Sequence, residues 1–353
     1  MSNMKRYVKR LLAGILTALL FLTGCSKLAD KDIQFTVGLN EDQLFKIGRE
    51  TATVPEAMIF VTTQKNIYEK AYGSEIWDID LSNGTFETYV RESLQNFLAQ
   101  MKCMVLMAAD RGIELTEEEK RLAKEAADAY YGKLSEADIA YMKLTPGTAK
   151  SVYEQYCLAN KLVEELTKDV NVEVSDSEAR IIQVEQILIK TYAVDANGNQ
   201  APLSEEDKAA KRQTAEEALH KAESGTDFSV LAESYNEGDA VNYKVGRGEF
   251  PESFEEAAFA LSDGELSGIV ETEYGYHIIK CIEDYDMEGT EMHKKEIAER
   301  KKSEAFSQVY DTFTAGLTAE YNKAAWDQIR FTGEARAEGA DFYEEYKAVF
   351  GVQ

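Results

Sequence analysis

Apolar residues recur every three or four positions along much of the chain, a spacing that predicts amphipathic helices. The pattern extends from about residue 34 to 172, returns from about 291 to 321, and ends in a short aromatic helix near residue 350. The clearest apolar stripe contains Val90, Leu94, Phe97, Leu98, Met101, Val105 and Ala108. That helix is expected to end at Gly112, and Thr116 to Glu119 reads as a capping-box start for the next.

Between residues 180 and 286 the spacing of the apolar residues changes, and several segments have the composition and alternation typical of β-strands. Residues 181–189 are β-branched and roughly alternating, which predicts a strand. Helices are expected at about 205–223, 228–235 and 251–261, and short strands at 242–246, 268–271 and 276–282. This β-α-α-β-α-β-β order is long enough for a domain of its own.

The two patterns together predict an α+β chain with an insertion. A discontinuous all-helical domain is expected from residues 25–175 and 287–353, with the C-terminal segment packed on the N-terminal one. The β-α-α-β-α-β-β domain, residues 180–286, is inserted between them. Residues 325–331 are expected to form a short closing strand or a turn.

Residues 1–24 have the composition of a secretory signal. A basic start precedes the apolar run Leu11–Leu22, which is shorter than the roughly 20 residues that a membrane-spanning helix needs. The sequence Leu22-Thr23-Gly24-Cys25 resembles a bacterial lipobox, in which the cysteine is lipidated and becomes the new N-terminus. A lipidated Cys25 would tether the protein to a membrane surface. The alternative is an ordinary signal peptide with a coincidental cysteine.

Charge and metal-ligand spacing exclude several classes of protein. The net charge is −25, and −29 without the leader, so a phosphate backbone would be repelled and nucleic acid is a poor partner. Cysteine and histidine spacings indicate no metal site, and no motif indicates a cofactor. Cys103, Cys157 and Cys281 are interpreted as small core residues, with a bridge between Cys103 and Cys157 as the alternative.

Four segments of the insert carry a family resemblance, and they occur in a fixed order: Glu185–Lys190, Gly246–Phe250, Phe254–Phe259 and Thr272–Ile279. Together they resemble a parvulin-type peptidyl-prolyl isomerase domain over about residues 180–286. With the lipobox and the helical flanks, the whole chain is similar to the PrsA/SurA group of extracytoplasmic foldases. The resemblance implies that the helical domain is chaperone-like.

The resemblance also implies where a proline-binding slot and its polar centre lie. Phe250 and Phe254 match the apolar residues of the slot, although the helical spacing of Phe254 equally suits a core residue. His277 matches the histidine of the last strand, and Thr272 matches the hydroxyl beside it. The alternative is that His277 is only a hydrogen-bonded core residue, as a histidine within an apolar strand more often is.

The chain departs from the family pattern at two positions. Gln186 stands where the first strand usually has a histidine, and its amide can bond His277 but cannot titrate. The loop that usually carries an aspartate or cysteine is shortened here, so Asp239 is the first choice for the loop acid and Glu237 the second. The alternative is that the acidic residue of this loop is an ordinary surface side chain surrounded by solvent.

The resemblance implies a membrane-anchored foldase outside the cytoplasm that isomerises X–Pro bonds in exported proteins. Its partners would be unfolded polypeptides and, through Cys25, the membrane. Because Gln186 replaces a histidine, the alternative is a holdase chaperone that binds unfolded chains with weak or no turnover. A solute-binding lipoprotein of a transporter would require two α/β lobes, and the pattern predicts a single α/β domain.

Overall fold

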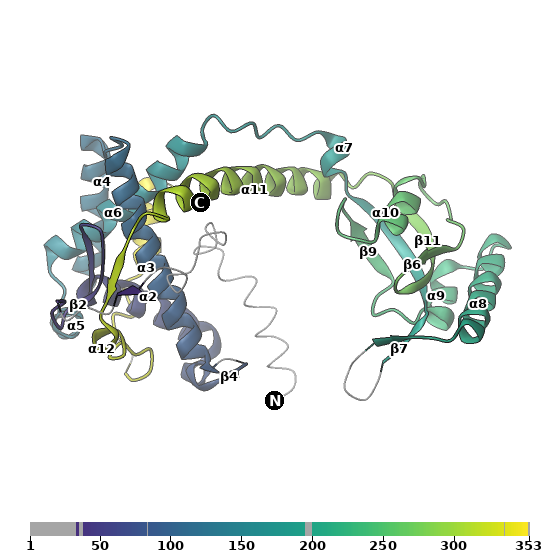
Figure 1. The fold of residues 1–353 in the computed structure, drawn as a ribbon, viewed down its shortest axis with the longest axis horizontal. Helices are drawn as coiled ribbons and strands as arrows, with labels where there is room; N and C mark the ends of the chain where they lie inside the picture. The colour runs from purple at the N-terminus through teal and green to yellow at the C-terminus, as the bar shows by residue number, and fades with distance from the viewer. Residues whose placement is uncertain (1–32, 35–37, 83, 195–199, 335, 352–353) are drawn as a thin grey trace. The chain divides into compact units, whose positions relative to one another are not determined.

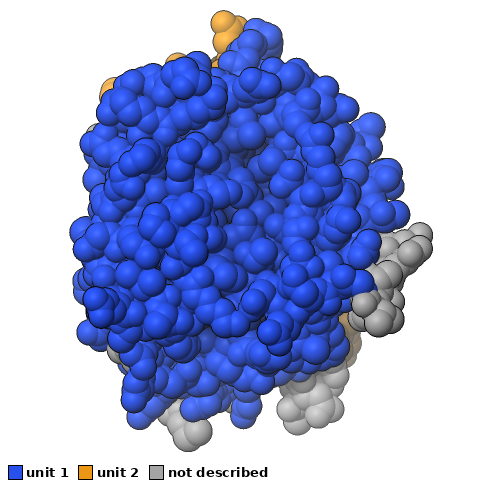
Figure 2. All heavy atoms as spheres, turned by 90° about the vertical axis from the view of Figure 1, so that its left-hand side faces the viewer, with its two compact units in different colours: residues 1–170, 302–353 blue, residues 171–301 orange. Residues whose placement is uncertain are grey.

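The computed structural model describes residues 33–34, 38–82, 84–194, 200–334 and 336–351. It contains two compact units, residues 1–170 with 302–353 (unit 1) and residues 171–301 (unit 2) (Figures 1 and 2). The predicted leader and Cys25 lie outside the described residues. The predicted mixed class of helix and sheet is confirmed. Across the described ranges, no helix is long and apolar enough to cross a membrane.

Unit 2 is built on an antiparallel four-stranded sheet in the order β10-β11-β6-β9. The strands are β6 (Ile182–Lys190), β9 (Asn242–Val245), β10 (Val270–Thr272) and β11 (Gly275–Glu283). A two-stranded ribbon of β7 (Tyr192–Val194) and β8 (Gln200–Pro202) follows β6. The predicted strand order is therefore present, with this ribbon added.

Two helices cover one face of this sheet, and one short helix covers the other (Figure 1). Helices α8 (Glu205–Glu223) and α9 (Phe228–Tyr235) cover one face, and α10 (Glu252–Phe259) covers the other. On the first face, Ile187, Ile189 and Ile278 pack on α8 and α9. On the second face, Ile182, Val184 and Ile279 pack on α10.

The alternation of side chains along a strand decides which face carries polar groups. Gln186 has the parity of Ile182 and Val184 on β6, and His277 has the parity of Ile279 on β11. Both therefore lie on the face that α10 covers. In the register, Gln186 is opposite Ile279 and His277 is opposite Leu188, so the two polar residues are diagonal neighbours.

Unit 1 is mainly helical, and the helix start that the sequence predicts at Thr116 is present in the structure. Thr116 caps its helix through a bond from Glu119 N–H to Thr116 Oγ1 (3.2 Å), while Thr116 N–H donates to Glu119 Oε2 (2.6 Å). The elements of the N-terminal segment are α2 (Val54–Tyr72), a 3₁₀ turn at Ser74–Asp78, the short strands β4 (Asp80–Leu81) and β5 (Gly84–Thr85), α3 (Phe86–Asp110), α4 (Glu117–Gly132), α5 (Glu136–Met142) and α6 (Pro146–Thr167).

The remaining helices follow the N-terminal segment along the chain. A one-turn helix, α7 (Asp176–Ala179), precedes β6 in unit 2. Helix α11 (Met287–Thr314) begins in unit 2 and ends in unit 1. Helices α12 (Lys323–Trp326) and α13 (Phe342–Phe350) complete unit 1.

Unit 1 also contains a small sheet, so the prediction of an all-helical domain was incomplete. Its order is β1-β12-β2-β3, formed by β1 (Ile33–Gln34), β12 (Ala319–Tyr321), β2 (Gln43–Ile47) and β3 (Glu50–Thr53). Strands this short have too few residues for an alternating pattern to stand out. Because β12 ends the stretch predicted as one helix, that helix ends at Thr314 rather than near Tyr321.

The C-terminal segment completes the core of unit 1. The Phe342 ring is fully buried and lies 4.3 Å from the ring of Tyr153 and 4.8 Å from that of Phe60, measured between centroids. The Tyr153 hydroxyl donates to the Phe342 carbonyl at 3.0 Å. Figure 2 shows the two chain segments of this unit in one colour. Two parts of the sequence separated by unit 2 therefore share one core.

Two other expectations are decided by the structure. Residues 325–331 form no strand, since α12 and a turn occupy that region. Cys103, Cys157 and Cys281 are all buried, and none of them forms a disulfide within the described ranges, which confirms their interpretation as core residues and excludes the alternative bridge.

We predict that Gly275→Ala destabilises unit 2 by more than about 2 kcal/mol. Gly275 has φ +142°, and an added Cβ would lie 2.1 Å from the Ile189 carbonyl oxygen on the neighbouring strand. Gly268→Ala is the control, because its Cβ would meet no atom within 4 Å. Calorimetric unfolding measures both variants. Equal midpoints for the two would contradict the prediction.

Candidate active site

A chain of hydrogen bonds joins three of the predicted site residues across three strands. His277 Nδ1 lies 2.8 Å from Gln186 Oε1, and His277 Nε2 lies 2.8 Å from Thr272 Oγ1. The backbone N–H of Tyr274 donates to the same Thr272 oxygen at 3.1 Å. Gln186, His277 and Thr272, predicted from separate segments, are thus in direct contact on the face covered by α10.

The partners of the imidazole fix the direction of these bonds. The Gln186 oxygen can only accept, so Nδ1 of His277 carries the proton and donates to it. Nε2 then accepts from the Thr272 hydroxyl, whose oxygen accepts from the Tyr274 N–H. Each group has one consistent role when the imidazole is neutral.

Burial keeps this imidazole neutral. His277 is 4% exposed, and desolvation lowers its pKa from 6.5 to about 4. A proton added at Nε2 would also lose the acceptor that the Thr272 hydroxyl uses. His277 is therefore suited to orienting its neighbours rather than to carrying protons near pH 7.

The amide nitrogen of Gln186 is the free end of this hydrogen-bond chain. It donates to no described residue. Among the described side chains, the fully buried polar atoms that lack a partner are Gln100 Nε2, Tyr130 OH and Tyr343 OH. Gln186 Nε2 is unpaired and is not one of these, so it is not completely sealed from solvent, although Gln186 as a whole is only 5% exposed. Gln186 thus presents an available N–H donor beside the anchored His277.

An aromatic row lies beside the polar chain. The Phe254 ring is 5.2 Å from the imidazole of His277, edge to face, and 5.1 Å from the Phe250 ring in a stacked arrangement. Phe254 is 1% exposed, as expected of a core residue, whereas Phe250 is only half-buried. Tyr243 on β9 meets Phe250 edge to face at 5.7 Å. Sequence reasoning missed Tyr243, whose only signal was an aromatic residue in a strand too short to show alternation.

The structure separates the two candidates for the loop acid. Both carboxylate oxygens of Glu237 already have partners, because Oε2 accepts the Lys190 N–H at 2.8 Å and the other oxygen pairs with Lys211. Asp239 is exposed and has no hydrogen bond or ion pair within the described parts of the chain. Neither acid belongs to the chain of bonds around His277. Asp239 remains the predicted loop acid.

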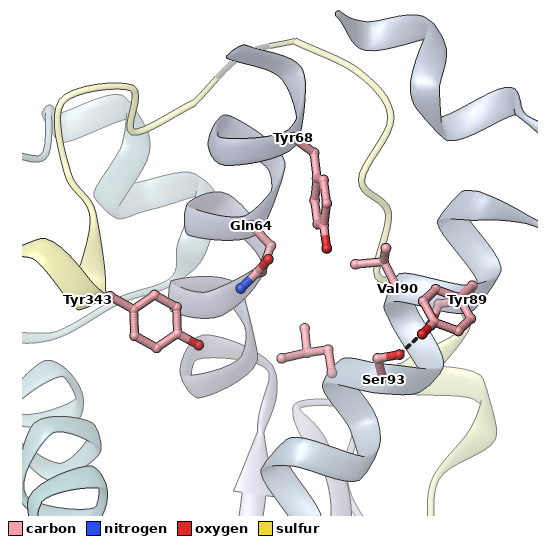
Figure 3. A pocket seen from close by; sticks show the side chains of 7 residues that line it. Gln64, Tyr68, Tyr89, Val90, Ser93 and Tyr343 are labelled. Carbon is pink, nitrogen blue, oxygen red and sulfur yellow. Dashed lines mark hydrogen bonds between the residues drawn. The ribbon is translucent and has the colours of Figure 1, made fainter. Parts of the chain in front are cut away.

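A small hollow lies in unit 1 between α2, α3 and α13. Figure 3 shows Tyr68, Tyr89 and Tyr343 around it, and the Tyr343 hydroxyl is buried without a partner among the described residues. Its volume is about 10 Å³, which is room for about one water molecule. This hollow is too small to hold a peptide side chain.

We predict that protonation of His277 destabilises unit 2 in mild acid. The folded-state pKa near 4 lies below the unfolded value of 6.5, so only the unfolded chain binds the proton between these values. Stability from this residue is present above pH 6.5 and falls by up to about 3 kcal/mol as the pH drops to 4. Denaturant unfolding at several pH values measures it. His277→Gln, which cannot titrate, should lack this part of the slope, and identical slopes would contradict the assignment.

Comparison with known proteins gives the family. A family model described as the PPIC-type PPIase domain of the rotamases matches residues 187–283. A solved structure of a peptidylprolyl isomerase (PrsA) from Bacillus cereus is 19% identical and covers 76% of this chain and 97% of its own, with a TM-score of 0.35. That score is too low to support an argument about the arrangement of the units.

Two curated relatives extend the match beyond this domain. The foldase protein PrsA of Caldanaerobacter subterraneus is 30% identical over 215 residues, 59% of this chain and 62% of that protein. The foldase protein PrsA 1 of Listeria innocua is 30% identical over 223 residues, 60% of this chain and 68% of that protein. The match to the first thus spans less than two thirds of its length. With unit 2 carrying a parvulin-type peptidyl-prolyl isomerase domain, the chain belongs to the PrsA family of foldases.

Proposed function

We propose that this protein is a foldase that catalyses cis–trans isomerisation of X–Pro bonds in exported proteins. It would act outside the cytoplasm, tethered to the membrane through a lipidated Cys25. The observation that carries the proposal is the contact between the aromatic row and the Thr272–His277–Gln186 chain on one face of the sheet. The PrsA relatives and the lipobox-like segment support the location.

The reaction needs a particular environment rather than a nucleophile. Rotation about a peptide bond faces a barrier of about 18–20 kcal/mol, and the uncatalysed X–Pro bond takes tens of seconds. No bond breaks, so the site has only to bind the twisted amide better than either planar form. Twisting leaves a nitrogen lone pair that can accept a hydrogen bond. A thousandfold acceleration requires about 4 kcal/mol.

The aromatic row supplies the apolar part of such a site. Phe250 is the ring of the stacked pair that remains accessible, and we assign to it the contact with the proline ring. Phe254 is buried, so it forms the floor on which Phe250 stacks. Tyr243 borders Phe250 on its other side. An apolar slot of this kind favours the less polar, twisted amide over the planar forms.

Gln186 supplies the hydrogen bond in this proposal. Its oxygen is anchored by His277, and its N–H group is free to donate to the nitrogen of the twisted amide. His277 and Thr272 orient it, because both ring nitrogens of His277 are already engaged. Asp239 would act as an exposed acid near the bound peptide. A holdase without turnover is the alternative, and the absence of a first-strand histidine favours it.

A refolding assay tests the proposal against the holdase. We expect the wild type to accelerate the slow, proline-limited phase of a client's refolding, and Phe250→Ala to lower this acceleration about tenfold. His277→Ala should also lower it, since Gln186 loses its anchor. Val230→Ala is the control, because it truncates an exposed apolar residue of α9, which covers the other face. If the wild type suppresses aggregation but leaves the slow phase unchanged, the isomerase proposal fails and the holdase stands.

The role of Gln186 can be tested separately. Gln186→Met removes both donor and acceptor, and Gln186→Glu keeps an oxygen for His277 but loses the N–H group. We expect both to lower kcat/KM about tenfold, the value of one hydrogen bond of roughly 1.4 kcal/mol. Gln183→Met on the same strand is the control, since that amide bonds Glu283 and Asp286 instead. Full activity of Gln186→Glu in the ionised form would exclude the donor role.

A further inference from the structure

We propose that Glu255 is a positioning residue that holds the accessible ring of the slot in place. It acts through the loop of residues 246–250, which joins β9 to α10 and carries Phe250. The inference rests on the proposed isomerase function and adds to it the group that fixes the slot. Within the described residues, Glu255 makes no hydrogen bond to Gln186, His277 or Thr272.

One carboxylate oxygen of Glu255 binds two consecutive backbone groups of this loop. Oε1 accepts the N–H of Glu249 at 2.8 Å and the N–H of Phe250 at 2.9 Å. Hydrogen bonds to an ionised acceptor are about twice as strong as neutral ones. The backbone on which the Phe250 side chain is mounted is therefore tied directly to α10.

Glu255 is well placed for this task within its helix. It lies in the first turn of α10, where a negative charge is favoured by the helix dipole. Pro251, the N-cap residue, provides no side-chain cap. The Glu255 carboxylate instead reaches back past Pro251 to the two residues before it.

The other contacts of the loop are made mostly away from Phe250: Arg247 donates to the Ser177 carbonyl at 3.1 Å, and its guanidinium lies 4.2 Å from the centre of the Phe259 ring. Gly248 has φ +84°, so the chain turns sharply before Glu249. The side chain of Glu249 accepts the Gly246 N–H at 3.1 Å, which closes the loop on itself without attaching it to α10. Phe250 is half-buried and stacks on Phe254 at 5.1 Å. The position of its ring thus depends on that stacking, on the edge-to-face contact with Tyr243 and on the Glu255 bonds.

Glu255 and Phe254 have different roles, although they are neighbours on α10. Phe254 is 1% exposed and belongs to the core of this face, so its position follows from packing. Glu255 is only half-buried, and removing its carboxylate leaves the core residues untouched. A positioning role therefore predicts a change in substrate binding that exceeds any change in stability.

The test compares Glu255→Ala, Glu255→Gln and the control Glu256→Ala in the full chain. Glu256 is the next residue on the helix and is exposed. Two measurements are made: kcat and KM for a short X–Pro peptide, and hydrogen exchange of the Glu249 and Phe250 amides. We expect Glu255→Ala to raise KM about tenfold, because a displaced Phe250 ring binds the proline less well, and to lower kcat as well, because the slot loses part of its preference for the twisted amide. The two amides should exchange faster.

Glu255→Gln keeps an oxygen at the same place without the charge, so intermediate values are expected, and Glu256→Ala should match the wild type. An unchanged KM in Glu255→Ala would overturn the proposal. So would faster exchange throughout the α10 face, including Phe254, because that would indicate a general structural role. If the wild type has no isomerase activity, the proposed function fails on its own. The positioning role is then judged from the two amides and from the peptide's Kd.

Discussion

The site of unit 2 depends on a neutral imidazole with both of its nitrogens engaged. His277 is buried, so its charged form is disfavoured, and a neutral ring has one donor and one acceptor. The Gln186 oxygen takes the donor, and the Thr272 hydroxyl serves the acceptor. A histidine in the place of Gln186 could exchange donor and acceptor roles with His277. In the orientation that the structure shows, the glutamine oxygen accepts from His277, which leaves its own N–H group available.

The two faces of the unit 2 sheet have different roles: one forms a closed hydrophobic core, and the other carries the candidate site. One face is sealed by α8 and α9 over residues such as Ile187 and Ile278. The other is covered by the eight-residue α10, which buries Phe254 but leaves Phe250 partly accessible. Because side chains alternate along each strand, polar groups could be placed on the second face without disturbing the first. The candidate site occupies the less completely covered face.

Unit 1 depends on contacts between distant parts of the chain. The hydrogen bond from Tyr153 to Phe342 joins residues 189 positions apart. Lys65 is buried on α2, yet its ammonium donates to the carbonyls of Phe331 and Gly333 at 2.9 Å. Lys102 is also buried and bonds the carboxylate of Glu56 at 2.7 Å. Buried cations of this kind require their partners, so the C-terminal segment is integral to the unit.

The sequence by itself determined those features that local periodicity and capping encode. The helices at 205–223 and 228–235, the capping box at Thr116 and the long strand now seen as β6 follow from residues close together in the chain. The order of four short segments was enough to indicate the family of unit 2 and the identities of Gln186, Thr272 and His277.

Only the tertiary structure decided which of these residues touch and which are accessible. The diagonal contact of His277 with Gln186 depends on the register of β11 against β6. The different exposure of Phe250 and Phe254 depends on how α10 packs. The sheet of unit 1 pairs strands from opposite ends of the chain. Register, packing and long-range pairing arise between segments that are far apart in sequence, so a local pattern carries no record of them.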